Sequence, residues 1–476
     1  MQQYLGFLPV VAIGFLLSAC QDSVQDSSVA QELVQESSAQ AQDQKKISLQ
    51  SQFSPLFLVD APKGGGHPIG GPAFNFVETA NLLLLPLDAH IGFHVTGEVA
   101  RWDVERVEPP LVKLPGDFAD LYQAVAANPE AGGIDMAVVI SNTNGFEFGT
   151  LLVAGLPFGL EPDEFISYLY DGGGLELQQK IYDEKFNQNL VVLPVGMTPT
   201  QGGGWFSQTL PEPGPDLSPE EAMATLCKRP IIVRWPAPGS NVWQKACANV
   251  GVETGSIGAQ ARCADVNAQC PGDDNPVVND VQSLTFGGFV FGGLPHALVL
   301  KDQIDAYELN TAYSDVLMMK LATDQADIEN DGADISNVIA KAPYLYGSTW
   351  HQPHSYIELI VNREFWESLS GPQRTAIRIA AQASVTQSLS LMLDVQDDGI
   401  AILEKNGAQL KDWPEGLLDL LRVASDEYLD EEAARLAANG DDSYKRVLQS
   451  QRDYIAGHQK YNDFGDVNQG RSRGVE

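Results

Sequence analysis

Basic residues are scarce in this sequence. The 476-residue chain holds 29 lysines and arginines against 63 aspartates and glutamates, so its formal net charge is −34. A field of that sign repels nucleic acid and anionic membrane surfaces, which excludes nucleic acid as a partner. A small anion held by a local basic group is still compatible with it. The length exceeds what one compact core organises, so the sequence predicts two domains.

Sequence signatures of catalysis are missing as well. The chain has no G-x-S-x-G elbow, H-E-x-x-H helix, Walker loop or dinucleotide-binding glycine fingerprint. His351, His354 and Glu358 in HQPHSYIE are residue types that bind zinc, although Pro353 breaks helical spacing between the histidines. A metal-dependent hydrolase built on these three residues is the enzymatic alternative. The sequence favours a protein that is not an enzyme.

Long hydrophobic runs are limited to one stretch near the start. Residues 5–17 are apolar, too few to span a bilayer comfortably, and SAC follows them. This resembles a bacterial lipoprotein signal, with residues 1–19 removed and Cys20 acylated; an uncleaved N-terminal helix is the alternative. Residues 20–52 are rich in Gln, Ser and Asp and predict a flexible tether. The mature protein is therefore expected to be a periplasmic lipoprotein held at the membrane by a lipid anchor.

Cysteine is also rare, with five in the chain. The four beyond the leader form an even number, which in an exported chain predicts two disulfides. We favour Cys227 with Cys247 and Cys263 with Cys270; a four-cysteine zinc site is the alternative, although no C-x2-C spacing supports it. Residues 253–290, around the second pair, have loop composition and predict a surface insertion. A calcium loop there is an alternative, although the aspartates lack the EF-hand spacing.

Helical and strand patterns alternate along the rest of the chain. Apolar runs at 82–97, 133–141 and 189–196 predict strands. Apolar residues recur at helical spacing over 161–188 and again over 371–407, where one long or broken helix is expected. This alternation predicts an α/β fold with mostly parallel sheets and a strongly helical C-terminal third.

Five motifs in a fixed order carry a family resemblance. They are AGLPFGLEPDEF, LPVGMTPTQGGGWF, RPIIVR, DQIDAYELNTAYSD and YGSTWHQPHSYIEL. Together they resemble the substrate-binding proteins of tripartite ATP-independent periplasmic (TRAP) transporters, especially the branch that binds 2-oxo acids and related monocarboxylates. The similarity extends over about residues 53–461. It implies a two-lobed, periplasmic-binding-protein-like α/β fold with hinge strands, a long connecting helix and a helical C-terminus.

The resemblance also implies domain boundaries. Lobe I would hold residues 53–199 and 311–362, and lobe II residues 200–310 and 363–430. Residues 431–476 would form a C-terminal helical segment. The two lobes would close on a ligand by a hinge motion.

Ligand-binding residues follow from the same resemblance. Arg234, at the end of PIIVR, matches the arginine that clamps the ligand carboxylate, for which its planar fork is suited. Gln201, Glu308 and the Leu309 carbonyl match the ligands of a bridging sodium or calcium ion. Ordinary ion pairs are the alternative for Arg234 and Glu308. The pocket wall and lobe edge add four candidates, Trp350, Phe158, Tyr346 and Asn142, while Trp205 is expected to be a core residue.

The expected function is therefore that of an extracytoplasmic solute-binding protein without covalent chemistry. It would capture a small carboxylate, a 2-oxo or 2-hydroxy acid, and deliver it to the membrane permease subunits of a TRAP transporter. A lipoprotein that senses the same ligand for a receptor would use the same binding chemistry and stays an alternative.

Overall fold

The computed structural model describes most of the chain beyond the leader. The leader, Cys20, Cys263, Cys270 and residues 254–290 of the predicted insertion lie outside it. Among the helices that are described, none is both long enough and apolar enough to cross a membrane. The described residues are 45–51, 70–95, 119–127, 135–140, 148–153, 155–229, 231–232, 238–253, 299, 302, 304–308, 311–322, 334–347 and 349–465.

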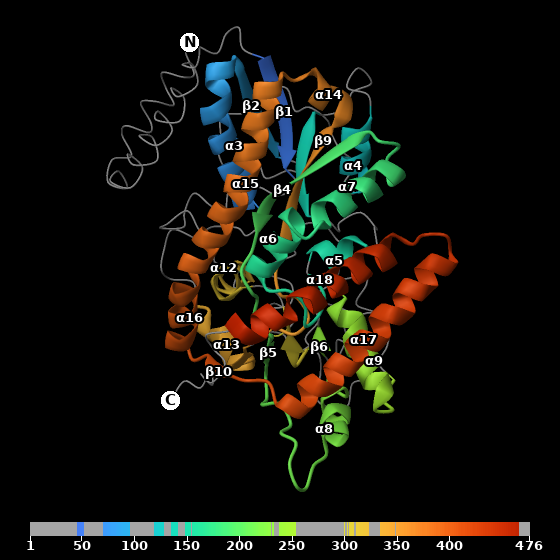
Figure 1. The fold of residues 1–476 in the computed structure, drawn as a ribbon. Coiled ribbons are helices and arrows are strands. Elements are labelled where there is room, and N and C mark those ends of the chain that lie inside the picture. The colour runs from blue at the N-terminus through green and yellow to red at the C-terminus, as the bar shows by residue number, and fades with distance from the viewer. Residues whose placement is uncertain are drawn as a thin grey trace.

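A five-stranded sheet organises the lobe drawn at the top of Figure 1. Ala137 and Val139 point into one hydrophobic core, and Met136 and Val138 point into another on the opposite face. Burial on both faces explains why the strand sequences are continuously apolar. In spatial order the strands are β2 (Ala89–Val95), β1 (Lys45–Ser51), β3 (Met136–Ile140), β9 (Tyr356–Asn362) and β4 (Leu190–Met197).

A second sheet, with shorter strands, organises the other lobe. Trp205 packs into the core on one of its faces and Phe206 into the core on the other. Trp205 is thereby confirmed as a core residue, with its indole nitrogen donating to Asp315 Oδ2 at 2.7 Å. The strand order is β10 (Gln409–Lys411), β8 (Tyr344–Tyr346), β5 (Gly204–Phe206), β7 (Ala306–Tyr307) and β6 (Ile231–Ile232).

Both sheets are mixed, so the expectation of mostly parallel sheets is wrong. In the first sheet β1 runs parallel to β2 and β3, whereas β9 runs antiparallel to β3 and β4. In the second, β5 is antiparallel to β7 and β8, while β6–β7 and β10–β8 are parallel pairs. The physical reason at β9 is its origin: β4 leaves the first sheet for the second lobe and β9 returns from it.

Three connections join the lobes in the described chain before residue 415. Residues 198–203 link β4 to β5, and residues 347–355 link β8 to β9. The third is a long helix, α15 (Gly371–Asp394), which Val395 separates from α16 (Gln396–Lys405). The helix expected over 371–407 therefore exists as a broken helix, and it joins the lobes as the expected long connecting helix.

The long helix bridges the two cores. In the first lobe α15 packs against β4 and α3 (Gly70–Leu84). In the second lobe α16 packs against α12 (Ala312–Ala322). Figure 1 shows this pair as one side of the molecule, running from the upper to the lower lobe.

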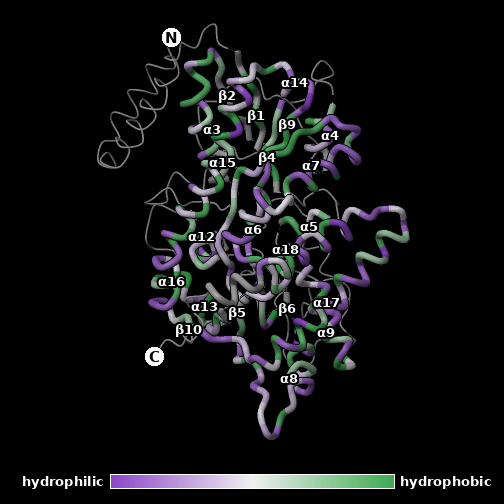
Figure 2. The backbone as a smooth tube through the Cα atoms, viewed as in Figure 1, coloured by the Kyte–Doolittle hydropathy of each residue, from purple (hydrophilic) through white to green (hydrophobic). Residues whose placement is uncertain are grey.

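The C-terminal helices also contact both lobes. α17 (Glu415–Ala438) packs on helices of the second lobe, and α18 (Ser443–Gly465) packs back on helices of the first. Figure 2 shows hydrophilic residues along much of their length, as expected of covering helices. Their partners are α8 (Pro219–Leu226) and α9 (Gly239–Asn249) in the second lobe, and α5 (Gly149–Val153) and α7 (Gly174–Lys185) in the first. The other described helices are η3 (Leu85–Leu87), α4 (Ala119–Ala126), α6 (Pro162–Tyr170), α13 (Ser336–Lys341) and α14 (Arg363–Ser368).

Several predicted boundaries are wrong. β1 lies inside the predicted tether, residues 20–52, because pairing with β2 and β3 outweighs its polar composition. The predicted strand at 82–97 begins as the end of α3, and within its described part, which ends at residue 95, only β2 is extended. β8 and α12, within the predicted lobe I range 311–362, belong to the second lobe, because β8 pairs in the second sheet and α12 packs into its core. Conversely α15, placed in lobe II, packs on the first sheet.

Candidate functional site

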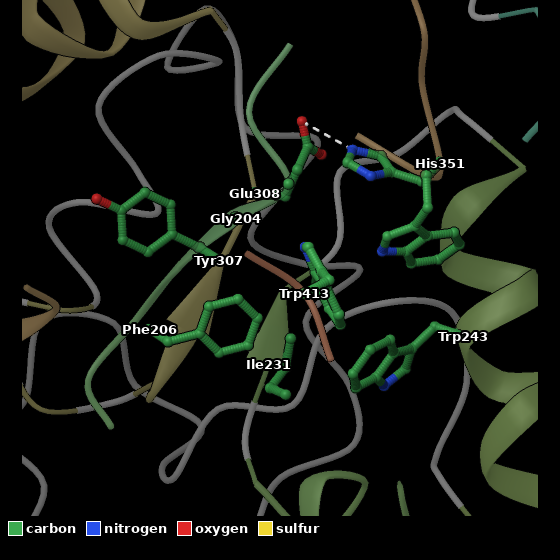
Figure 3. Close-up of a pocket in the computed structure, with 10 residues that line it drawn as sticks. Gly204, Phe206, Ile231, Trp243, Tyr307, Glu308, His351 and Trp413 are labelled. Carbon is green, nitrogen blue, oxygen red and sulfur yellow. Dashed lines mark ion pairs between the residues drawn. The ribbon is translucent and has the colours of Figure 1, made fainter. Parts of the chain in front are cut away.

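A small pocket lies where β7 ends and the second interlobe connection passes (Figure 3). Its cavity volume is about 10 Å³, close to the space of one water molecule. A small organic acid therefore needs the lining side chains or the lobes to move apart before it can enter. The lining residues are Gly203, Gly204, Phe206, Ile231, Trp243, Tyr307, Glu308, Trp350, His351 and Trp413.

The polar end of this pocket is an acid–imidazole pair. Glu308, which directly follows β7, and His351, in the 347–355 connection, are both almost fully buried. Glu308 Oε1 lies 3.1 Å from His351 Nε2, the pair joined by the dashed line in Figure 3. A Cβ at Gly239 would lie 2.6 Å from the His351 Cβ, so glycine at the start of α9 lets the helix approach the histidine closely. The predicted Glu308 is thus a buried pocket residue.

Three tryptophans form the apolar part of the wall. Trp350 stacks on Trp243 with ring centroids 6.5 Å apart and meets Trp413 edge-on at 6.4 Å. They come from the 347–355 connection, from α9 and from the segment before α17. Aromatic faces of this kind suit an apolar or planar portion of a ligand. The predicted position of Trp350 in the cleft is consistent with this arrangement.

Gln201 belongs to a polar network between the two strand connections. Its Nε2 donates to Ser355 Oγ at 3.1 Å, and Gln352 Nε2 donates to the same oxygen at 2.9 Å. The Oε1 atoms of both glutamines are buried without a hydrogen-bond partner among the described residues. A buried carbonyl oxygen left in this state favours a donor or a cation as its partner.

Two predicted wall residues lie behind the pocket instead of lining it. The Phe158 ring stacks on Trp350 at 6.1 Å, and its backbone N–H donates to Trp350 O at 2.8 Å. The Tyr346 hydroxyl accepts from Leu210 N at 2.8 Å, and burial raises the pKa of this hydroxyl. Both residues therefore support lining residues from behind: Phe158 packs on Trp350, and Tyr346 packs on Phe206 and Trp413.

Three predicted site residues, Arg234, Asn142 and Leu309, lie outside the described residues. Of the cysteines, Cys227 and Cys247 are joined by a disulfide that ties the end of α8 to α9. This holds α9, and with it Trp243, against the second lobe.

The metal-dependent hydrolase built on His351, His354 and Glu358 is wrong, because these three residues face different partners. His351 pairs with Glu308, as described above, while the His354 ring lies 4.1 Å from Phe165. Glu358 is enclosed in the first lobe, where it accepts hydrogen bonds from Tyr122, Gln178 and Tyr182. Among the described residues no three His, Cys, Asp or Glu side chains are grouped as metal ligands would be.

Burial also sets the protonation states of His354 and Glu358. It lowers the pKa of His354 from 6.5 to about 3, so the ring is neutral near pH 7. It raises the pKa of Glu358 from 4.5 to about 7, partly offset by the hydrogen bonds from the two tyrosines and Gln178. Neither group lines the pocket.

Four side chains that line the pocket could not be identified from the sequence. Trp243 and Trp413 carry no local signal, since a tryptophan near the start of a helix is usually a packing residue. The two-residue strands β6 and β7, which supply Ile231 and Tyr307, are too short to show a periodic pattern. The glycines at 202–204, where β5 begins, are a local signal that could have been used, since consecutive glycines often mark a close approach of backbone.

Comparison with known proteins supports the sequence resemblance. No protein-family model matches the chain. It is 22% identical over 313 residues to a monocarboxylate 2-oxoacid-binding periplasmic protein of Nostoc sp., a match that spans 66% of each protein. The chain therefore covers slightly less than two thirds of that relative's length.

Solved structures share the fold. A TRAP periplasmic solute-binding protein from Colwellia psychrerythraea, with bound calcium and pyruvate, superposes with a TM-score of 0.59 at 19% identity, covering 89% of this chain and 98% of the other. One from Pseudoalteromonas atlantica, with bound sodium and pyruvate, gives 0.57 at 18% identity, covering 90% and 99%. The two-lobed fold expected from the motifs is confirmed, and these relatives are solute-binding proteins, not enzymes.

Proposed function

We propose that this chain is the extracytoplasmic solute-binding component of a TRAP transporter, and that it captures a small 2-oxo or 2-hydroxy carboxylate. The observation that carries the proposal is the pocket itself, which combines one buried acid–imidazole pair with a wall of three tryptophans. It sits at the carboxyl end of β7, the edge of a sheet where α/β proteins bind ligands. Relatives with this fold hold pyruvate together with calcium or sodium.

A bridging cation fits the oxygen atoms of the site. Glu308 supplies a buried carboxylate in the pocket, and Gln201 supplies a buried carbonyl oxygen with no hydrogen-bond partner in the described chain. Oxygen donors of this kind suit sodium or calcium and not zinc. The Leu309 carbonyl completes the proposed set. The ion would neutralise the repulsion between Glu308 and an anionic ligand.

The carboxylate clamp in this proposal is Arg234. β6 and β7 are parallel, with Ile232 opposite Tyr307, so both strands end at the same edge of the sheet. Glu308 follows β7 directly, and Arg234 follows Ile232 by two positions in the sequence. A guanidinium offers two parallel hydrogen bonds to a carboxylate. Asn142, which follows β3 in the sequence by two positions, completes the proposed polar contacts.

Delivery of the ligand completes the proposal. The lipid anchor at Cys20 would hold the protein at the membrane beside its permease subunits, and the chain between the anchor and β1 would act as a tether. Metabolic labelling with a radioactive fatty acid tests the anchor: the wild-type chain should incorporate label and Cys20→Ser should not.

Ligand capture is tested by thermal shift on the chain from residue 20 onward with Cys20→Ser. Pyruvate, lactate and phenylpyruvate are each added with sodium, with calcium or with chelator. A ligand at 100 times its Kd stabilises the folded state by about 2.7 kcal/mol, which raises Tm by several degrees. Arg234→Ala should abolish the shift, and Glu308→Gln should abolish its cation dependence. Arg452→Ala, on α18 and paired with Asp430, is the matched control. If no acid shifts Tm with either cation, the proposal fails.

A further inference from the structure

We infer that the indole N–H of Trp413 donates a hydrogen bond to an oxygen of the bound acid, so that Trp413 is a specificity-determining residue of this pocket. The inference rests on the proposed function and extends it to a residue that neither the motifs nor the resemblance single out. Trp413 lies between β10 and α17, and the residue is 6% exposed.

The observation behind it is an unpaired donor. Trp413 Nε1 is buried and has no hydrogen-bond partner among the described residues. In Figure 3 the indole nitrogen is on the side of the ring that faces Glu308 and His351, the polar end of the pocket. Buried tryptophan N–H groups ordinarily find an acceptor. Trp205 shows the ordinary case in this same lobe, since its Nε1 donates to Asp315.

The nitrogen is held in place by close packing. A Cβ at Gly203 would lie 2.4 Å from Trp413 Nε1, so the ring occupies space that only glycine leaves free. On other sides the ring meets Phe206 at 5.7 Å and Tyr346 at 5.8 Å, both edge-on. A donor packed in this way loses little conformational freedom when a ligand binds, which favours a strong contribution to binding.

The chemistry of the donor defines the ligand atom. An indole N–H donates and cannot accept, so the facing atom must be an acceptor such as a carboxylate, 2-oxo or 2-hydroxy oxygen. Trp243 and Trp350 place apolar surface in the same pocket. The ligand class is therefore an acid whose oxygens lie at one end and whose apolar tail lies between aromatic rings.

The test measures Kd by calorimetry, with pyruvate and phenylpyruvate as probes in sodium and in calcium. Two variants remove the donor: Trp413→Phe, and replacement of Trp413 by 3-benzothienylalanine, which keeps the bicyclic ring and has sulfur in place of the N–H. Losing a hydrogen bond to a charged group should raise Kd about tenfold or more. Trp366→Phe, a buried tryptophan of α14 in the first lobe, is the matched control and should leave Kd unchanged.

The outcomes separate this inference from the proposed function. If wild type binds either probe and the benzothienylalanine variant binds equally well, the N–H makes no contact with the ligand and the inference is overturned. If both Trp413 variants bind about tenfold more weakly while Trp366→Phe does not, the inference is supported. If wild type binds neither acid with either cation, the proposed function is wrong, and the inference that rests on it is wrong as well.

Discussion

Replacement of Glu358 by glutamine should change how the stability of the protein depends on pH. Glu358 lies in β9, between β3 and β4, with its carboxyl group fully buried. Burial raises its pKa from 4.5 to about 7, although Tyr122, Tyr182 and Gln178 donate hydrogen bonds to it. The folded chain therefore holds this proton over a pH range in which the unfolded chain releases it.

The sign and size of the effect follow from this difference. Below pH 4.5 the carboxyl group is protonated in both states and costs nothing. As pH rises from 4.5 to 7 the unfolded state ionises first, so the free energy of unfolding falls, and above pH 7 the loss is complete. A pKa difference of 2 to 3 units corresponds to roughly 3 kcal/mol.

Urea unfolding at half-unit steps from pH 4.5 to 8, followed by tryptophan fluorescence, measures this loss. Wild type should lose about 3 kcal/mol more across the range than Glu358→Gln, because glutamine does not ionise. Glu367→Gln, an exposed glutamate of α14, should follow wild type. Parallel curves for wild type and Glu358→Gln would refute the reasoning, since they would mean that the carboxyl group ionises alike in both states.

Three other predictions follow from the packing. The pKa of His354 is lowered to about 3, so stability should fall by about 2 kcal/mol between pH 6.5 and 5 as the unfolded chain takes up the proton, and urea unfolding of His354→Leu should lack this loss. Replacing Cys227 and Cys247 by alanine removes a disulfide with a sequence separation of 20. Under oxidising conditions this should lower the free energy of unfolding by about 3 kcal/mol. Under reducing conditions, where wild type also lacks the disulfide, the two proteins should be equally stable. Gly203→Ala places a Cβ 2.4 Å from Trp413, so it should lower the free energy of unfolding by about 1–3 kcal/mol and alter the tryptophan fluorescence. Gly214→Ala is the control, since its Cβ would meet nothing within 4 Å, and it should change neither quantity. Equal melting curves for the two variants would contradict the close contact at Gly203.

The sequence predicts the central parts of the fold well, where burial shapes composition. β3 and β4 are covered on both faces, so their residues are continuously apolar and easy to identify. β1, with the sequence KKISLQS, does not show such a run, and only its partners in the sheet make it a strand. β6 and β7 contain two residues each, too few for any periodicity. Strand direction was also missed, because β9 arrives from the other lobe.

Some residues of the candidate site could be identified from the sequence and others could not. Glu308 and Trp350 were found because they sit in motifs that resemble a family, and both line the pocket. Trp243 comes to the pocket from α9 and Trp413 from the segment between β10 and α17, so no spacing in the chain connects them. Phe158 was assigned to the pocket wall, yet it lies behind Trp350. Which of two stacked rings faces a cavity depends on packing depth, which sequence does not encode locally.

The connections between the lobes have a mechanical consequence. Thr198 N donates to Ser355 O at 3.0 Å and Ser355 N donates to Thr198 Oγ1 at 2.7 Å, so the two strand connections are fastened together where they leave the first sheet. We therefore expect the two connections to move together as one unit. In Figure 1 the α15–α16 pair runs along one side of the molecule, whereas α17 lies beside the lower lobe and α18 crosses the middle of the view. Because the connections are tied to each other at Thr198 and Ser355, any change in the angle between the lobes has to bend both of them at once.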